Sequence, residues 1–181
     1  MIVLGIDPGT RHFGWGIVAR DGTRMIHRAH GVIAPCADLS LGDRLVAIEE
    51  ELSRVVETHR PARASLEAIF FAKDAQAAAK LGHARGVALL VCARAGLAIS
   101  EYPPARVKRT VTASGRADKP QVAQMVRALL ALADVPAADA ADALALAITS
   151  LQESPLASIT RSSEGLAPPG QRVHRRRRYT V

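Results

Sequence analysis

The chain has 181 residues, of which 49% are hydrophobic, so it can form one ordinary domain with a substantial core. It carries 24 basic and 17 acidic residues, and this net charge of +7 favours a polyanionic partner without identifying it. No apolar run reaches the roughly 18 residues of a membrane span, and the opening MIVLGID lacks a basic leader region, so we expect a cytoplasmic protein. Cys36 and Cys92 have no second thiol or histidine at a ligand spacing, which argues against a disulfide framework and against a zinc site.

The first part of the chain predicts three strands and a helix. Apolar runs over residues 1–7, 12–20 and 23–34 are separated by short Pro- and Gly-containing turns, which is typical of an antiparallel meander. Residues 41–58 then carry one apolar stripe at helical spacing, with charged residues on the opposite side.

The middle of the chain alternates between strands and helices. A strand over 62–69, an Ala-rich helix over 74–94 and a strand over 97–102 form the alternation that builds parallel crossovers. Within that helix, residues 86–93 (GVALLVCA) are apolar nearly all round. We therefore expect them to be covered on more than one side, by the core or by a second subunit.

The last part of the folded region predicts helices only: a short basic one after Pro103-Pro104, then helices over 120–132 and 137–151. Together the elements predict an α/β fold with a five-stranded mixed sheet, in which three antiparallel strands are followed by parallel crossovers and helices flank the sheet.

The C-terminal end differs in composition from the rest. Beyond Ser150 there are 6 basic and 2 acidic residues, against 18 and 15 before it, and the sequence ends in HRRRRYTV with little to bury. We expect one folded domain over residues 1–153 and a flexible basic tail over 154–181. The run Arg175 to Arg178 is equally compatible with a DNA-binding arm and with a solubilising tail.

Two of the predicted strands end in a carboxylate. Asp7 closes the apolar run IVLGI and Glu67 closes ASLE, so strands in the sheet's interior would carry both to their C-terminal ends. A charge in such a position is costly without a partner. Taken alone, Asp7 could instead begin the turn at Pro8-Gly9, and Glu67 could face solvent.

A second acidic pair lies on the last predicted helix. In PAADAADALALAI the only polar side chains are Asp139 and Asp142, which lie one turn apart on the same side of a helix. Helix capping after Pro136 would explain one of them, but two like charges at the edge of a buried face favour a bound cation. With Asp7 and Glu67 they would form an all-oxygen site, which suits Mg²⁺ or Mn²⁺, and two such ions are a known device for phosphodiester hydrolysis.

Four segments occur together in the order and spacing of one family: GIDPGTRHFGWGIV, LEAIFFAKDAQAAAKLGHARGVAL, VKRTVTASGRADKPQV and DAADALALAI. Over about residues 1–150 the chain resembles the RuvC family of Holliday-junction resolvases. The resemblance implies an RNase H-like fold and a dimeric endodeoxyribonuclease of recombination and repair that makes paired symmetric nicks in four-way DNA junctions. It also implies the RuvAB branch-migration complex as a partner, and the metal-binding catalytic set Asp7, Glu67, Asp139 and Asp142.

Basic residues that could bind DNA phosphates crowd one segment: Arg106, Lys108, Arg109, Arg116 and Lys119. A solvated basic surface is the alternative. The resemblance implies that Lys108 and Lys119 support junction binding and cleavage, and that Phe70 stacks on DNA bases, whereas the position of Phe71 stays open.

Four further residues carry less definite expectations. Gly14 and Gly16 interrupt a strand, for which a close approach of DNA or metal and a bulge are both possible reasons. His27 and His30 are three apart on a predicted strand, so we expect them to point to opposite faces and not to share a ligand.

Three other classes of protein share parts of this pattern. YqgF-type nucleases, thought to process RNA, share the early aspartate and a late acidic helix. Actin-like and sugar-kinase-like ATP-binding proteins share GIDPGT but duplicate their domain, for which this chain is too short. A non-catalytic nucleic-acid-binding module would need only the basic segment. The lysines together with DAADALA favour the junction enzyme.

Overall fold

The computed structural model describes residues 1–68 and 75–153. Its centre is a five-stranded sheet in the order β3-β2-β1-β4-β5. β1, β2 and β3 pair antiparallel, whereas β1, β4 and β5 pair parallel. The strands are β1 (Ile2–Asp7), β2 (Phe13–Asp21), β3 (Arg24–Ile33), β4 (Arg63–Glu67) and β5 (Ala98–Tyr102). The predicted mixed sheet is therefore confirmed, including its meander and its crossovers.

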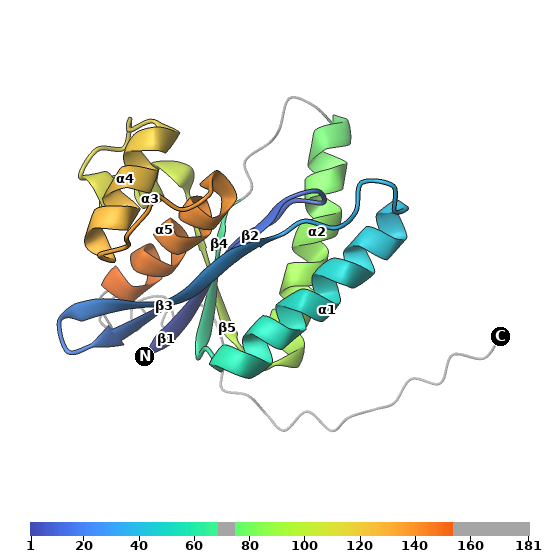
Figure 1. Cartoon of the computed structure of the whole chain (residues 1–181), viewed down its shortest axis with the longest axis horizontal. Helices are drawn as coiled ribbons and strands as arrows, with labels where there is room; N and C mark the ends of the chain where they lie inside the picture. The colour runs from blue at the N-terminus through green and yellow to red at the C-terminus, as the bar shows by residue number, and fades with distance from the viewer. Residues whose placement is uncertain (69–74, 154–181) are drawn as a thin grey trace, which may run out of the picture.

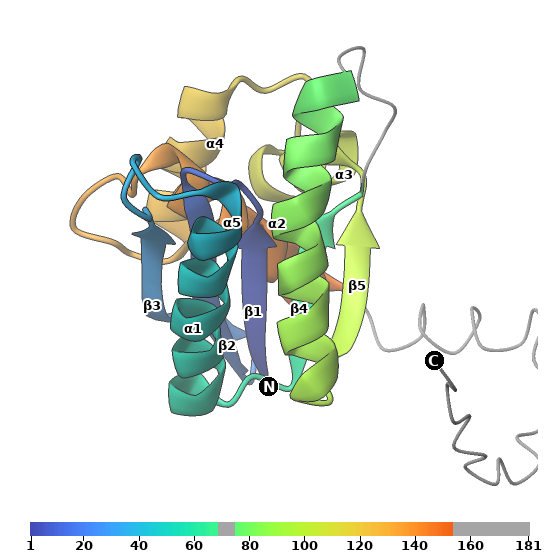
Figure 2. The same cartoon turned by 90° about the vertical axis from the view of Figure 1, so that its right-hand side faces the viewer.

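Helices cover both faces of this sheet (Figures 1 and 2). One face carries α1 (Leu41–His59) and α2 (Ala75–Arg94), and the other carries α3 (Pro104–Thr112), α4 (Lys119–Leu129) and α5 (Ala138–Gln152). Every helix expected from the sequence is present, with ends that differ by a few residues.

Helix α5 lies directly against the backbone of β1 and β2. A Cβ added to Gly5 would lie 1.8 Å from the carbonyl oxygen of Ala143, and one added to Gly14 would lie 2.0 Å from that of Asp139. At Gly16 the nearest atoms, at 2.7 Å, belong to the α5 side chain Leu144. The glycines in these strands thus allow a helix to approach, which is neither of the two reasons expected from the sequence.

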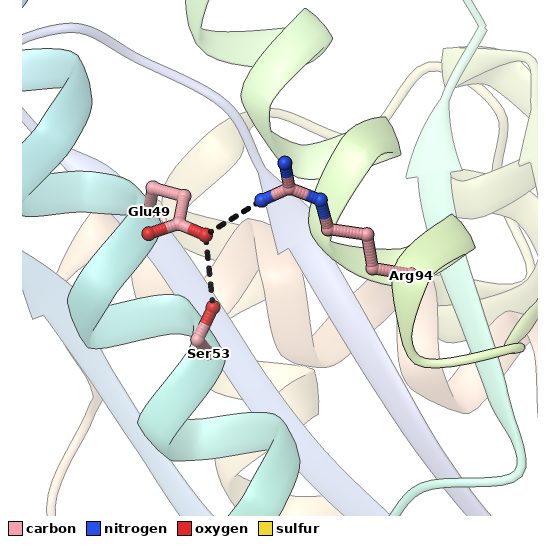
Figure 3. A network of polar contacts seen from close by, with 3 residues as sticks. All are labelled: Glu49, Ser53 and Arg94. Atoms are coloured by element: carbon pink, nitrogen blue, oxygen red, sulfur yellow. Dashed lines mark hydrogen bonds and ion pairs between the residues drawn. The ribbon is translucent and has the colours of Figure 1, made fainter.

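The opposite face is held by aliphatic side chains. Leu4 and Ile6 of β1 and Ile17 of β2 pack with the α1 residues Ile48 and Leu52, and all five are fully buried. A polar contact also joins the two helices of this layer, as Figure 3 shows. Arg94 of α2 forms an ion pair with Glu49 at 3.4 Å, and Ser53 donates a hydrogen bond to the same carboxylate at 3.5 Å.

One side of helix α2 packs into the core that it shares with α1 and the sheet. Ala84, Ala88, Val91 and Cys92 are buried, whereas Leu90 keeps 47% of its surface exposed. Within this chain the apolar segment 86–93 is therefore covered on one side, so the expected cover on a second side is not provided by the core. None of the helices in residues 1–68 and 75–153 is both long and apolar enough to span a membrane.

A β-bulge in β3 corrects the prediction for the two histidines. The register with β2 skips Arg28, so the side-chain alternation shifts there by one residue. His27 is then opposite Val18 and His30 opposite Gly16, both of which face α5. The two rings lie on the same face, with His27 Nε2 and His30 Nδ1 2.7 Å apart. The expectation of opposite faces is wrong because it assumed an unbroken strand.

Candidate active site

Adjacent parallel strands bring the first two carboxylates together. In the β1–β4 register Ile6 lies beside Leu66, so Asp7 and Glu67 are the next neighbours at the C-terminal ends of these strands. Side chains alternate along a strand, and Ile6 and Leu66 belong to the core on the α1 side. Asp7 and Glu67 therefore face the α5 side of the sheet.

The α5 contact brings the second acidic pair to the same place. Gly14 pairs with Asp7 in the sheet, and the backbone of Asp139 lies against Gly14. Asp142 follows one helical turn later. The helix has Ala137 at its N-cap, without a side-chain capping bond, so neither aspartate serves as the N-cap.

One pocket is lined by three of the four predicted carboxylates and by two lysines, whereas Asp139 is not among its lining residues. Its polar lining comes from the carboxylates of Asp7, Glu67 and Asp142 and from Lys108 and Lys119. The remaining walls are the apolar residues Pro104, Val107, Val122 and Leu146. Three carboxylates in a partly apolar pocket are a typical arrangement for a cation-dependent site.

Helix α4 places one lysine directly on the acidic cluster. The Nζ of Lys119 lies 2.9 Å from Oδ2 of Asp142. Lys119 is held at the start of α4 by a capping box. The Asp118 side chain accepts a hydrogen bond from the backbone N–H of Gln121, and the Gln121 side chain accepts one from the backbone N–H of Asp118. Pro120 occupies the first turn of this helix, where proline is well tolerated.

Two carboxylates of the pocket, Asp7 and Glu67, have raised pKa values in spite of that lysine. Burial, followed by the charges of Asp142 and Asp139, raises the pKa of Asp7 to about 7. Burial and Asp142 also raise the pKa of Glu67, against the opposing effects of Lys119 and Lys108. Burial and repulsion between carboxylates therefore outweigh the effect of the neighbouring lysines on these two pKa values.

The donor set fits a hard divalent cation. The acidic residues that line the pocket offer only carboxylate oxygens as ligands. Mg²⁺ and Mn²⁺ prefer such ligands. In residues 1–68 and 75–153 no three Asp, Glu, His or Cys side chains already have the spacing of a metal-ligand group.

One residue next to this site is not among those singled out from the sequence. Arg85 of α2 is buried, with 6% of its surface exposed. Its Nη1 donates to the carbonyl oxygen of Glu67 at 2.6 Å, and its Nη2 lies 2.6 Å from Oε1 of Glu101 on β5. Its signal in the sequence is a charged residue directly before the apolar segment 86–93.

The other basic residues lie outside the acidic pocket. Arg106 of α3 forms an ion pair with Glu153 at 2.9 Å and lies over the ring of Tyr102. Arg109 and Arg116 are exposed. The predicted DNA-stacking residue Phe70 lies outside the described residues, as does its neighbour Phe71.

Comparisons with known proteins agree with this fold. A sequence model of the family described as "Crossover junction endodeoxyribonuclease RuvC" matches residues 3–150. A protein of that name from Sorangium cellulosum is 54% identical over 177 residues, which cover 98% of this chain and 99% of the relative. Another from Bradyrhizobium diazoefficiens is 50% identical over 147 residues, or 81% of this chain and 84% of the relative.

Solved structures give the same answer. Thermus thermophilus RuvC in complex with a Holliday-junction substrate superposes with a TM-score of 0.77 at 34% identity, covering 82% of this chain and 92% of that one. A yeast mitochondrial Holliday-junction resolvase, at 13% identity and a TM-score of 0.58 over 81% of this chain and 76% of that one, shares the fold. The expected RNase H-like fold is confirmed, and the chain belongs to the RuvC family of crossover junction endodeoxyribonucleases.

Proposed function

We propose that this chain is a metal-dependent, structure-specific endonuclease that resolves four-way DNA junctions in recombination and repair by paired, symmetric nicks. The observation that carries the proposal is the pocket in which Asp7, Glu67 and Asp142 face Lys108 and Lys119. Carboxylates suit a divalent cation, whereas lysines suit the phosphate that the reaction must bring beside it. The chain's relatives are named for this activity.

The four carboxylates would hold Mg²⁺ or Mn²⁺, in two ions per site. Such ions would supply an activated water at neutral pH and stabilise the leaving 3′ oxygen. The protein's part is positioning: β1 and β4 fix Asp7 and Glu67, while α5 fixes Asp139 and Asp142 against the same sheet. Lys108 and Lys119 would hold the scissile phosphate against this cluster.

Basic side chains around the pocket would bind the DNA backbone without reading its sequence. The exposed Arg109 and Arg116 extend the positive surface away from the two pocket lysines. Arg106 would have to leave Glu153 to contribute. Phe70 would stack on a base at the junction, as the family resemblance implies.

Paired nicks require two active sites, so the working unit would be a homodimer. The uncovered apolar side of α2 around Leu90 offers a surface for the second copy. The domain would span residues 1–153, with 154–181 as a basic tail. In a cytoplasmic setting the enzyme would act with the RuvAB branch-migration complex.

A cleavage assay on a synthetic four-way junction, with linear duplex beside it and Mg²⁺ or Mn²⁺ added, tests this function. Replacing Asp142 with Asn should reduce junction cleavage by roughly a hundredfold or more, because a metal ligand contributes several kcal/mol to the transition state. Junction binding should persist, since Asn keeps the shape and removes only a negative charge.

The matched control is Asp134→Asn, the same chemical change at an exposed residue of the loop before α5. It should leave cleavage unchanged. Equal cutting of duplex and junction by the unmodified chain would remove the resolvase assignment and leave a nuclease. Full cleavage by Asp142→Asn would remove the nuclease as well.

A further inference from the structure

We propose that Lys119 is an exchangeable counter-cation: its ammonium group holds Asp142 until a divalent cation binds, and is then displaced onto a DNA phosphate. This inference rests on the proposed function and adds to it a link between the metal site and the DNA-binding surface. It assigns to one lysine two successive partners, a carboxylate and a phosphate.

The contact itself is the first support. Lys119 Nζ and Asp142 Oδ2 are 2.9 Å apart, and the side chains are 73% and 28% exposed, respectively. The lysine therefore reaches the cluster from solvent on a flexible stem, whereas the aspartate projects from a helix whose neighbouring residues are buried. Of the two partners, only the lysine can leave without disturbing the core.

The backbone below the lysine is fixed. The capping box formed by Asp118 and Gln121, with bonds of 2.8 and 3.1 Å, holds the first turn of α4, and Val122 and Val126 bury the helix against the core. An exchange of partners would thus require only rotations within the lysine side chain. Such rotations need no movement of a helix and are fast.

Charge supplies the direction of the exchange. The lysine lies close enough to lower the pKa of both Asp7 and Glu67, so its charge is felt by the whole cluster. A divalent cation brings twice the charge and binds several oxygens at once, so it competes for Asp142 and repels the ammonium group. The displaced lysine remains on the rim of the pocket, where a phosphate of the substrate must lie.

The exchange has a consequence for both ligands. Metal binding would release a cationic group to DNA, and DNA binding would remove a competitor from the metal. By thermodynamic linkage each ligand must then strengthen the binding of the other by the same factor. Lys108 lines the same pocket and has no ion pair in the described part of the chain, so it would lack this dual role.

The test measures Mn²⁺ binding to the full chain without DNA, from the electron paramagnetic resonance signal of free Mn²⁺. Unmodified protein is compared with Lys119→Met, Lys108→Met and Asp142→Asn. Both Met variants lose one positive charge from the pocket, but only the first loses the ion pair. Lys119→Met should bind Mn²⁺ about three- to tenfold more tightly than the unmodified chain, and Lys108→Met should change affinity by less than about twofold.

Thermal unfolding gives a second readout that does not depend on activity. With EDTA, Lys119→Met should melt below the unmodified chain, because the carboxylates lose their counter-cation. Saturating Mn²⁺ should raise the Tm of Lys119→Met by more than it raises that of the unmodified chain, because tighter binding stabilises the folded state more. Equal Mn²⁺ affinity in the two lysine variants would overturn the exchange, whereas no saturable binding, or binding unaffected by Asp142→Asn, would overturn the proposed metal site itself.

Discussion

The two faces of the sheet hold their helices in different ways. On one face α5 lies on glycine backbone, with no side chain between Gly5 and Ala143. On the other face α1 is separated from the sheet by full-sized aliphatic side chains such as Ile48 and Leu52. Side chains can change rotamer to absorb a small change in volume, but backbone atoms in direct contact cannot.

The stiffer contact lies on the face that carries the proposed metal site. Asp139 and Asp142 belong to α5, and the strands below it end in Asp7 and Glu67. A metal-binding constellation tolerates errors of only about 0.5 Å, so direct backbone contact is a suitable way to set the distance between the two pairs. The α1 face has no such constraint and relies on volume alone.

Adding one carbon to the stiff face should have the largest effect. In Gly5→Ala the new Cβ would meet the carbonyl of Ala143, so α5 must move away from β1. We expect a loss of roughly 3 kcal/mol or more in the free energy of unfolding, at the upper end for overpacking, because backbone must yield. Urea denaturation measures the stability, and Mn²⁺ affinity should fall because Asp142 moves with the helix.

The control for this change is Gly42→Ala in the first turn of α1. There the added Cβ would meet only the side-chain oxygen of Ser40, at 3.8 Å. It should be neutral or slightly stabilising, by at most about 1 kcal/mol. A Gly5→Ala chain as stable as Gly42→Ala would show that α5 can shift freely and would refute the distinction between the faces.

A second change tests the place where α2 reaches across to the site. Arg85→Lys keeps the charge but loses the planar fork that joins the Glu67 carbonyl to Glu101, for an expected loss of about 1–3 kcal/mol. Cleavage should fall further than stability explains, because Glu67 loses its backbone anchor. Arg94→Lys on the same helix is the control, since its ion pair with Glu49 is exposed and should contribute less than about 1 kcal/mol.

Much of the fold could be predicted because each element carries a local signal. The apolar run before Asp7, the stripe of residues 41–58 and the proline at the start of α4 all identify their elements without tertiary information. The four carboxylates could also be singled out, since a charge at the end of a buried strand or at the edge of a buried helix face is costly without a partner. The family's motif order added the expectation that they converge.

What could not be predicted depends on contacts between distant segments. Nothing near Gly14 in the sequence indicates that α5 will lie on it, and nothing near Arg85 indicates that its partners are a strand carbonyl and Glu101. No sequence feature around Arg28 indicates the bulge. Sequence alternation therefore predicts opposite faces for the two histidines, although they share one face. Each of these features is decided by packing across the sheet.

Removing one carbon from the softer face should have a smaller effect. Ile48 is fully buried between α1 and the sheet, and Ile48→Val should reduce the free energy of unfolding by about 1 kcal/mol, as is usual for the loss of one methyl group. Mn²⁺ affinity and junction cleavage should be unchanged, because no backbone contact is altered. A loss of metal affinity here would mean that the α1 face also sets the geometry of the site.

The smallest expected effect concerns the histidine pair on the edge strand of the α5 face. Burial, and for His27 also the nearby His30, lowers the pKa of both rings below the ordinary 6.5. As the pH falls below that value the unfolded chain takes up protons before the folded chain does, so these two residues make stability decrease toward low pH. His30→Asn should reduce this decrease in urea denaturation measured from about pH 8 to pH 5, while changing little at pH 8, where both rings are neutral. An unaltered pH dependence in His30→Asn would mean that neither the burial of His30 nor its charge beside His27 lowers a histidine pKa in the folded chain.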